Sequence, residues 1–182
     1  MRSANPEVRT AALYNARVFV LRYAYVLALV VWLGGMVVLG ALVAPATFQI
    51  LQASAPANGR ALAGDLFGQI LARFHYVAYA SGAVLLVSLI AMALLGPRPR
   101  AFAVRLAVIA AMLLLSLYSG FIVLATIDAI QAEIGRLPSL LPPGDPRRIR
   151  FDELHVLSTR LMMANIVGAL ALLYWEARDT GQ

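Results

Sequence analysis

Residues 101–127 read AFAVRLAVIAAMLLLSLYSGFIVLATI, and this stretch decides the fold. It is apolar along almost its whole length, and Arg105 is its one charged residue. A helix needs about 20 apolar residues to cross the hydrocarbon core of a bilayer. The stretch therefore predicts a transmembrane helix.

Three other stretches have the same character: residues 23–43, 76–95 and 155–175. The chain of 182 residues is 62% hydrophobic and 13% charged, whereas soluble domains carry about 25% charged residues. This composition excludes a soluble globular enzyme and a disordered chain. We predict one all-α domain over residues 1–182, an integral membrane four-helix bundle with up-down-up-down topology.

The helices are expected to extend beyond the membrane on the outer side. Residues 58–74 carry apolar side chains every four positions, which predicts an amphipathic helix continuous with the second span. The first helix is expected to end at Pro45, and the third at Gly135. Asp145 is a suitable N-cap for the fourth helix, with Pro146 in its first position.

The charges predict how the chain sits in the membrane. All 15 basic residues are Arg, the net charge is +6, and cysteine is absent. Because the Arg residues flank apolar runs, we expect lipid headgroups as their partners and no nucleic acid. Four Arg residues precede the first span and the short connection 96–100 is basic. Both features predict cytoplasmic termini, in a bacterial inner (plasma) membrane.

Polar side chains inside a span are functional candidates, because their burial costs free energy. His75 lies twenty residues before Leu95, and His155 lies twenty residues before Trp175. The two imidazoles are therefore expected at one depth near the outer membrane edge, where they could face each other. The candidate ligand or metal residues are His75, His155, Ser158, Met162 and Asp128. The expected supporting polar pocket comprises Arg73, Arg160, Asn165, Phe151 and Pro45.

Several chemistries fit such a set. Two facing imidazoles could ligate the iron of haem b, Met162 could add a soft ligand for Cu(I), and a His–Asp pair could relay protons. The alternative is structural, since a histidine near the interface can simply hydrogen-bond a neighbouring helix. No catalytic residue is assigned, because the sequence has no serine–histidine–aspartate order, phosphate loop or HExxH motif.

Short motifs along the chain form a family pattern. They are Trp32-x-Gly34-Gly35, Pro45-x-x-Phe48, Ala63-Gly64-x-x-Phe67-Gly68, Phe74-His75 and Phe151-x-x-Leu154-His155-x-x-Ser158. Over about residues 22–175 this pattern resembles the transmembrane-protein-205-like domain family, small four-helix membrane proteins of unassigned function. The resemblance implies the same architecture and carries the family's polar positions to His75, Phe151, His155 and Ser158. Where that family has Asn, seven residues after the second histidine, this chain has Met162, and Asn165 follows three residues later.

Three functional hypotheses follow. The first is a membrane protein whose outward-facing polar pocket, around His75 and His155, binds a small ligand, a lipid or a partner protein. The second is a redox protein that holds b-type haem or a metal on the same two histidines. The third is a transporter subunit, which would have to form a homo-oligomer or join another membrane protein because four spans make a small pathway.

Overall fold

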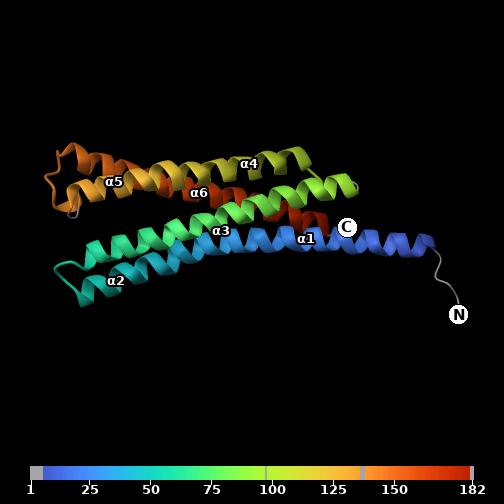
Figure 1. Ribbon diagram of the computed structural model, residues 1–182, viewed down its shortest axis with the longest axis horizontal. Coiled ribbons are helices and arrows are strands. Elements are labelled where there is room, and N and C mark those ends of the chain that lie inside the picture. Colours follow the sequence, from blue (N-terminus) through green and yellow to red (C-terminus); the bar gives the residue numbers. More distant parts are fainter. Residues whose placement is uncertain (1–5, 97, 136–137, 181–182) are drawn as a thin grey trace.

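The computed structural model describes residues 6–96, 98–135 and 138–180, which form four long helical rods (Figure 1). No strand occurs within these ranges, which confirms the predicted all-α class. The first rod comprises α1 (Pro6–Val38), the π-helix η1 (Leu39–Val43) and α2 (Ala44–Ser54), and the second is α3 (Gly59–Leu95). The third comprises α4 (Phe102–Tyr118), the π-helix η2 (Ser119–Leu124) and α5 (Ala125–Ile134), and the 3-10 turn η3 (Pro138–Leu140) leads to the fourth, α6 (Pro146–Thr180).

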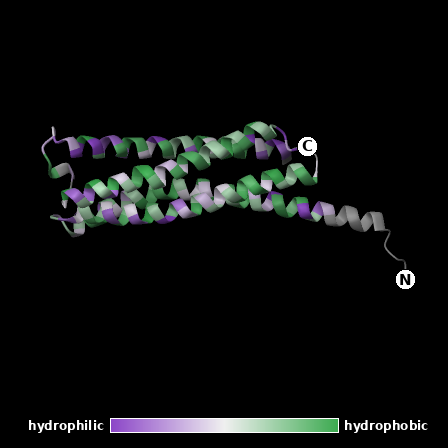
Figure 2. Ribbon diagram, turned by 45° about the horizontal axis from the view of Figure 1, so that its top comes forward, coloured by the Kyte–Doolittle hydropathy of each residue, from purple (hydrophilic) through white to green (hydrophobic). Residues whose placement is uncertain are grey.

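All four rods are suited to a membrane. Within the described ranges, the segments long and apolar enough to cross it are Tyr14–Ser54, Gly59–Leu95, Phe102–Ile134 and Pro146–Asp179. Figure 2 shows hydrophobic residues along the length that the helices share. The chain is therefore an integral membrane protein. The 37 residues of α3 extend about 55 Å at about 1.5 Å per residue, so this helix is longer than the hydrocarbon core of about 30 Å.

The rods pack in a ring. α1 and α4 each pack against both α3 and α6, whereas no comparable contact joins α1 to α4 or α3 to α6 in the described part of the chain. The core lies in the half of the bundle that carries the termini and includes Tyr25, Leu29, Trp32, Leu85, Leu89, Ile109, Met112 and Leu172. Many large hydrophobic side chains are also exposed on the outer faces of the helices, as a lipid environment requires.

Two of the predicted helix ends are confirmed. Gly135 follows α5 in the left-handed conformation, with φ of 62°, which glycine adopts without steric cost. Asp145 caps α6, because its Oδ1 accepts a hydrogen bond of 2.9 Å from the backbone N–H of Arg147. Residues 59–74 also form one helix with the second span, as the apolar spacing predicts.

The prediction that the first helix ends at Pro45 is wrong. The chain passes through η1 into α2, and Pro45 lies in the first turn of α2. A proline within an α-helix removes one hydrogen bond and clashes with the carbonyl four residues earlier, here that of Ala41. Ala41 lies in η1, whose wider π-helical turn accommodates this disruption, so the helix continues to Ser54.

A buried ion network closes the end of the bundle that carries the termini. Arg105 is only 1% exposed, and it donates hydrogen bonds to Glu176 at 2.5 Å and to Asp179 at 2.8 Å. Arg22 of α1 donates to the other oxygen of Glu176, and the Tyr25 ring lies 4.9 Å from the Arg105 guanidinium carbon. The network joins α1, α4 and α6, and a charge-neutral set of paired groups is the form in which charge is tolerated inside a membrane bundle.

Candidate functional site

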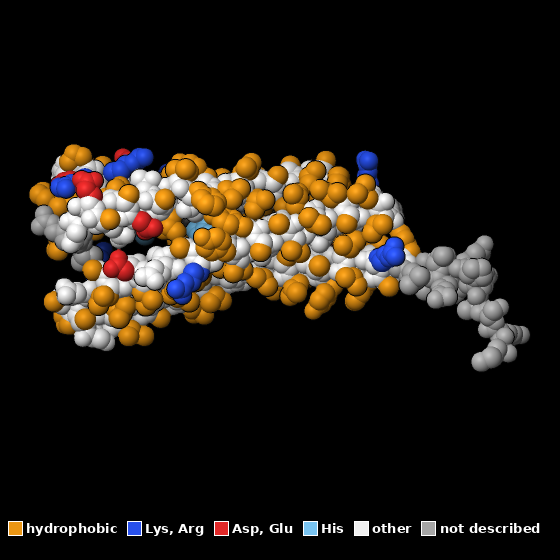
Figure 3. Space-filling model, viewed as in Figure 1, with side chains coloured by type: hydrophobic (Ala, Val, Ile, Leu, Met, Phe, Trp, Pro, Cys, Tyr) orange, Lys and Arg blue, Asp and Glu red, His pale blue; other side chains and the backbone are white. Residues whose placement is uncertain are grey.

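At the end away from the termini the bundle separates into two pairs of helices. α2 packs with α3, and α5 packs with α6, and the described residues make no comparable contact between the pairs. Figure 3 shows the surface hollowed at this end, with acidic side chains on both edges of the hollow. We call the first pair, α2 with residues 59–72 of α3, the first arm. The second arm is α5 with residues 146–158 of α6.

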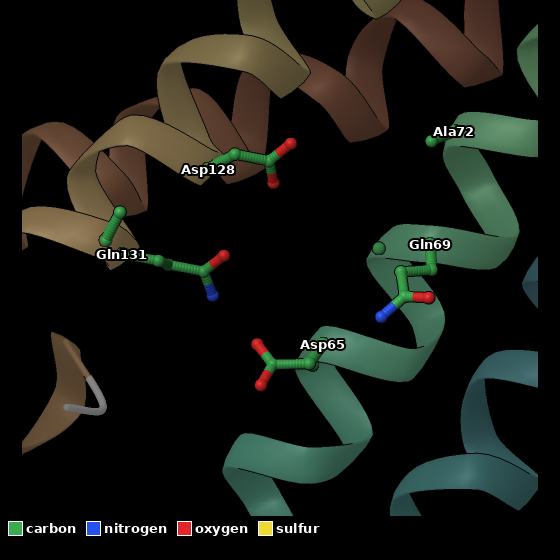
Figure 4. A pocket seen from close by; sticks show the side chains of 8 residues that line it. Asp65, Gln69, Ala72, Asp128 and Gln131 are labelled. Atoms are coloured by element: carbon green, nitrogen blue, oxygen red, sulfur yellow. The ribbon is translucent and has the colours of Figure 1, made fainter. Parts of the chain in front are cut away.

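Between the arms lies a cavity of about 470 Å³. Its lining comes from α3 and α5 and comprises Gly64, Asp65, Gly68, Gln69, Ala72, Asp128, Gln131 and Ala132. Figure 4 shows that the side chains of Asp65 and Gln69 from α3, and of Asp128 and Gln131 from α5, all point into this space. Two carboxylates and two carboxamides therefore face one cavity from opposite arms.

Small residues explain why the cavity is open. Gly64, Gly68 and Ala72 follow one another at four-residue spacing, so they share one face of α3. A Cβ atom added at Gly64 or at Gly68 would meet nothing within 4 Å. The α3 wall thus lacks the side chains that would fill the gap toward α5, and the neighbouring Asp65 and Gln69 supply its polar groups.

His75 lies one helical turn beyond Ala72, deeper in the bundle. It is 8% exposed, and its Nδ1 donates to the carbonyl oxygen of Leu71 at 2.8 Å. Because a carbonyl can only accept, Nδ1 carries a proton in this contact. No hydrogen bond to Nε2 is found in the described part of the chain. His75 lies just beyond the inner end of the α3 residues that line the cavity.

The π-helix η2 makes room for this histidine. A Cβ atom added at Gly120 would clash with the hydroxyl of Tyr79 and would lie 2.9 Å from Cδ2 of His75. Tyr79 also donates to the carbonyl oxygen of Ser116 at 3.4 Å, where α4 passes into η2. A π-helix interrupts regular backbone hydrogen bonding, and the tyrosine hydroxyl supplies a donor at that point.

Asn165 of α6 completes this buried polar layer. Its Nδ2 donates to the Ser116 hydroxyl at 3.3 Å and to the Leu161 carbonyl at 3.2 Å. The Leu161 contact fixes the orientation of the amide, because a carbonyl accepts only from the NH₂ group. Asn165 is 4% exposed, and its Oδ1 has no hydrogen-bond partner among the described atoms. Such an acceptor costs free energy unless a donor reaches it.

The second predicted histidine has a different environment. His155 is exposed, and its ring stacks on Phe151 of the same helix with centroids 6.3 Å apart. The expectation that His155 faces His75 across the bundle is therefore wrong. The reason is that the helices diverge toward this end, where α6 packs with α5 and makes no comparable contact with α3 in the described part of the chain. Ligation of one haem by both histidines would need an imidazole on each face of its iron, and the exposed ring of His155 does not fit that arrangement.

The remaining predicted residues are dispersed. Asp128 lines the cavity, and the methyl group of Met162 lies beside Gly40 of η1, 3.4 Å from where a Cβ atom would be. Asn165 is buried, and Ser158 is half-buried. The exposed members of the predicted set are Pro45, Arg73, Asp128, His155 and Arg160.

Three polar residues of the cavity were not among the predicted site residues. They are Asp65, Gln69 and Gln131. The available signal was the series Gly64, Gly68 and Ala72, since small residues on one helix face leave room beside polar neighbours. Within the described part of the chain, no three His, Cys, Asp or Glu side chains gather as a metal site would require.

Comparison with known proteins gives one family. Residues 27–136 match the family described as Domain of unknown function (DUF4149). The chain belongs to the DUF4149 family. All of the cavity-lining residues of this DUF4149 protein lie within the matched segment, whereas His155 and Asn165 lie outside it. No curated protein and no solved structure matches the chain.

Proposed function

We propose that this DUF4149 protein binds a small organic cation in the cavity between its two arms. The observation that carries the proposal is the pair Asp65 and Asp128, whose carboxylates point into one cavity of about 470 Å³ from α3 and α5. Cavities of roughly 300–1,000 Å³ hold small molecules. Carboxylates accept hydrogen bonds only, so the complementary group is a cationic donor such as a protonated amine.

An organic cation fits better than a bare metal ion. The cavity contains two carboxylates rather than the larger oxygen cage that Ca²⁺ takes. The carboxamides of Gln69 and Gln131 both donate and accept, so they suit the polar part of an organic molecule.

The side of the membrane on which the cavity opens is part of the proposal. The Arg residues before the first span and in connection 96–100 favour cytoplasmic termini. The cavity lies at the end away from the termini (Figure 1), so it would open to the outside. The kinship with the transmembrane-protein-205-like family is likewise a proposal. It is supported by two of the shared motifs meeting in the fold, because the Phe74 ring occupies the space above Gly35.

Calorimetry on the full chain in lipid nanodiscs tests the binding proposal. We expect 1,4-diaminobutane to bind saturably and the uncharged 1,4-butanediol not to bind. Asp65→Asn and Asp128→Asn should each weaken binding by about 10–100-fold, because a charged hydrogen bond contributes about 1.5–3 kcal/mol. Glu133→Gln is the matched control, since Glu133 is an exposed acid on α5 that does not line the cavity.

Three results would contradict the proposal. The diamine could fail to bind, the Glu133→Gln variant could lose as much affinity as Asp128→Asn, or Ca²⁺ could bind while the diamine does not. The last result would replace the organic cation with a metal ion. Folding of each variant is checked by the helical circular dichroism of the same sample, so a loss of structure is distinguished from a loss of binding.

A further inference from the structure

The arms that form the cavity contain little hydrophobic core. Neither α2 nor α5 has a buried residue. All residues of the buried core cluster lie outside the two arms. Segments with few buried apolar contacts are the ones that move at low free-energy cost. The arms are therefore the part of the described structure best suited to change position.

Each arm also begins at a π-helix. η1 precedes α2 in the first arm, and η2 precedes α5 in the second. Each of these segments has a glycine at its second position, Gly40 and Gly120. π-helical turns weaken regular hydrogen bonding and are frequent at functional sites and at helix kinks. The other helix of each arm, α3 or α6, is a long uninterrupted helix, which can bend gently along its length.

The facing surfaces of the arms are shaped to approach each other. On the α3 side, Gly64 and Gly68 have open space in front of them. Ala132 lines the α5 side. Small residues on facing helices allow their backbones to pack closely in a membrane protein. The carboxylates of Asp65 and Asp128 oppose this approach, because like charges on the two arms repel each other.

We propose that the two arms close on the bound organic cation, with η1 and η2 as the hinges. This inference rests on the proposed function and adds a conformational response to it. The cation removes the repulsion between Asp65 and Asp128 and links them, so the closed form is favoured only when ligand is present. Closure brings the small residues of α3 against α5 and encloses the ligand between them.

Spin labels measure the closure directly, and the absence of native cysteine makes labelling specific. One pair, Gln52→Cys with Asp152→Cys, places exposed labels on opposite arms. The control pair, Leu27→Cys with Leu114→Cys, lies on α1 and α4 in the half of the bundle that carries the termini. Saturating 1,4-diaminobutane should shorten the distance between the arms by several ångströms and leave the control distance unchanged.

A second variant tests the closing surface, with its diamine binding measured by calorimetry on the same sample because both positions line the cavity. Gly64→Leu with Gly68→Leu fills the α3 wall, and the open form tolerates it because a Cβ atom meets nothing at either position. We expect this variant to keep the long distance between the arms in the presence of the diamine. Gly34→Leu is the matched control, since a Cβ atom at Gly34 also meets nothing within 4 Å, and it should close as the wild type does.

The outcomes distinguish the two proposals. If calorimetry shows that the diamine binds while the distance between the arms stays unchanged, closure is wrong and the proposed binding function stands. If the distance shortens equally in the Gly64→Leu/Gly68→Leu variant, the small-residue faces are not the closing surface and the inference is also wrong. If the diamine does not bind at all, the proposed function and the closure that rests on it both fail.

Discussion

Arg105 is a residue whose burial and ion pairs could not be predicted from the sequence alone. It lies in the first turn of α4, where a basic residue beside the membrane would ordinarily extend to the headgroups. Instead it is 1% exposed and bound by Glu176 and Asp179. These two acids stand near the C-terminal end of α6, where their local sequence indicates a solvated helix end. Their pairing with Arg105 depends on how α4 and α6 pack, which no spacing along the chain reveals.

Arg105→Met is expected to destabilise the protein by about 3–5 kcal/mol, because it removes the cation that pairs with Asp179 and with one oxygen of Glu176. Chemical unfolding in detergent, followed by circular dichroism, measures the effect. Arg98→Met is the control, since Arg98 is exposed in the connection between α3 and α4. The triple variant Arg105→Met/Glu176→Gln/Asp179→Asn should regain much of the lost stability. Equal stability of the Arg105→Met and Arg98→Met proteins would show that the network contributes nothing.

Two glycines of the first arm should respond oppositely to alanine. Gly68→Ala is expected to stabilise the protein by about 0.5–1 kcal/mol, because alanine favours a helix interior and its Cβ meets nothing in the open form. Gly59→Ala is expected to cost about 1–3 kcal/mol, because its Cβ would clash with the backbone carbonyl of Leu51. Unfolding midpoints of the two variants provide the comparison, and a destabilised Gly68→Ala protein would indicate that the arms are already closed without ligand.

At the scale of elements, the start of α6 gives a pH prediction. Side-chain and backbone hydrogen bonds from Arg147 lower the pKa of Asp145 to about 2. Because this pKa is below the ordinary value of 3.8, the cap stabilises the helix start above pH 3.8, and its contribution is lost as the pH falls through about 2. Hydrogen exchange of the first α6 amides should therefore remain protected at pH 4 in the wild type and be faster in Asp145→Ala. Equal exchange rates in the two proteins would contradict the cap.

The sequence predicts the four long helices but not the cavity between the two arms. The apolar runs predict the four spans, and Gly135 and Asp145 mark real helix boundaries, because these signals are local. The prediction that the first helix ends at Pro45 was wrong because no comparable local signal in the sequence marks the π-helix that accommodates this proline. The cavity was not predicted because it forms where two pairs of helices diverge, and its position depends on packing. Of the candidate site residues, Asp128 lines the cavity, whereas His155, which was expected to face His75, is exposed.

At the scale of the whole molecule, the proposed orientation can be measured with single cysteines. Gly144→Cys lies in the turn before α6 at the end with the cavity, and Arg98→Cys lies in the connection at the end with the termini. In intact cells a membrane-impermeant maleimide should label Gly144→Cys and should label Arg98→Cys only after the cells are opened. The reverse pattern would place the cavity on the cytoplasmic side, and binding of an external cation would then be excluded.

The most direct test of the central claim compares two amines on one protein. If Asp65 and Asp128 together hold one cation-bearing ligand, 1,4-diaminobutane should bind the wild type at least about tenfold more tightly than 1-butylamine, since the second charged contact is worth about 1.5 kcal/mol or more. In Asp65→Asn the two amines should bind alike. Equal affinities in the wild type, or a preference for the diamine that survives in Asp65→Asn, would contradict a site built from the two carboxylates.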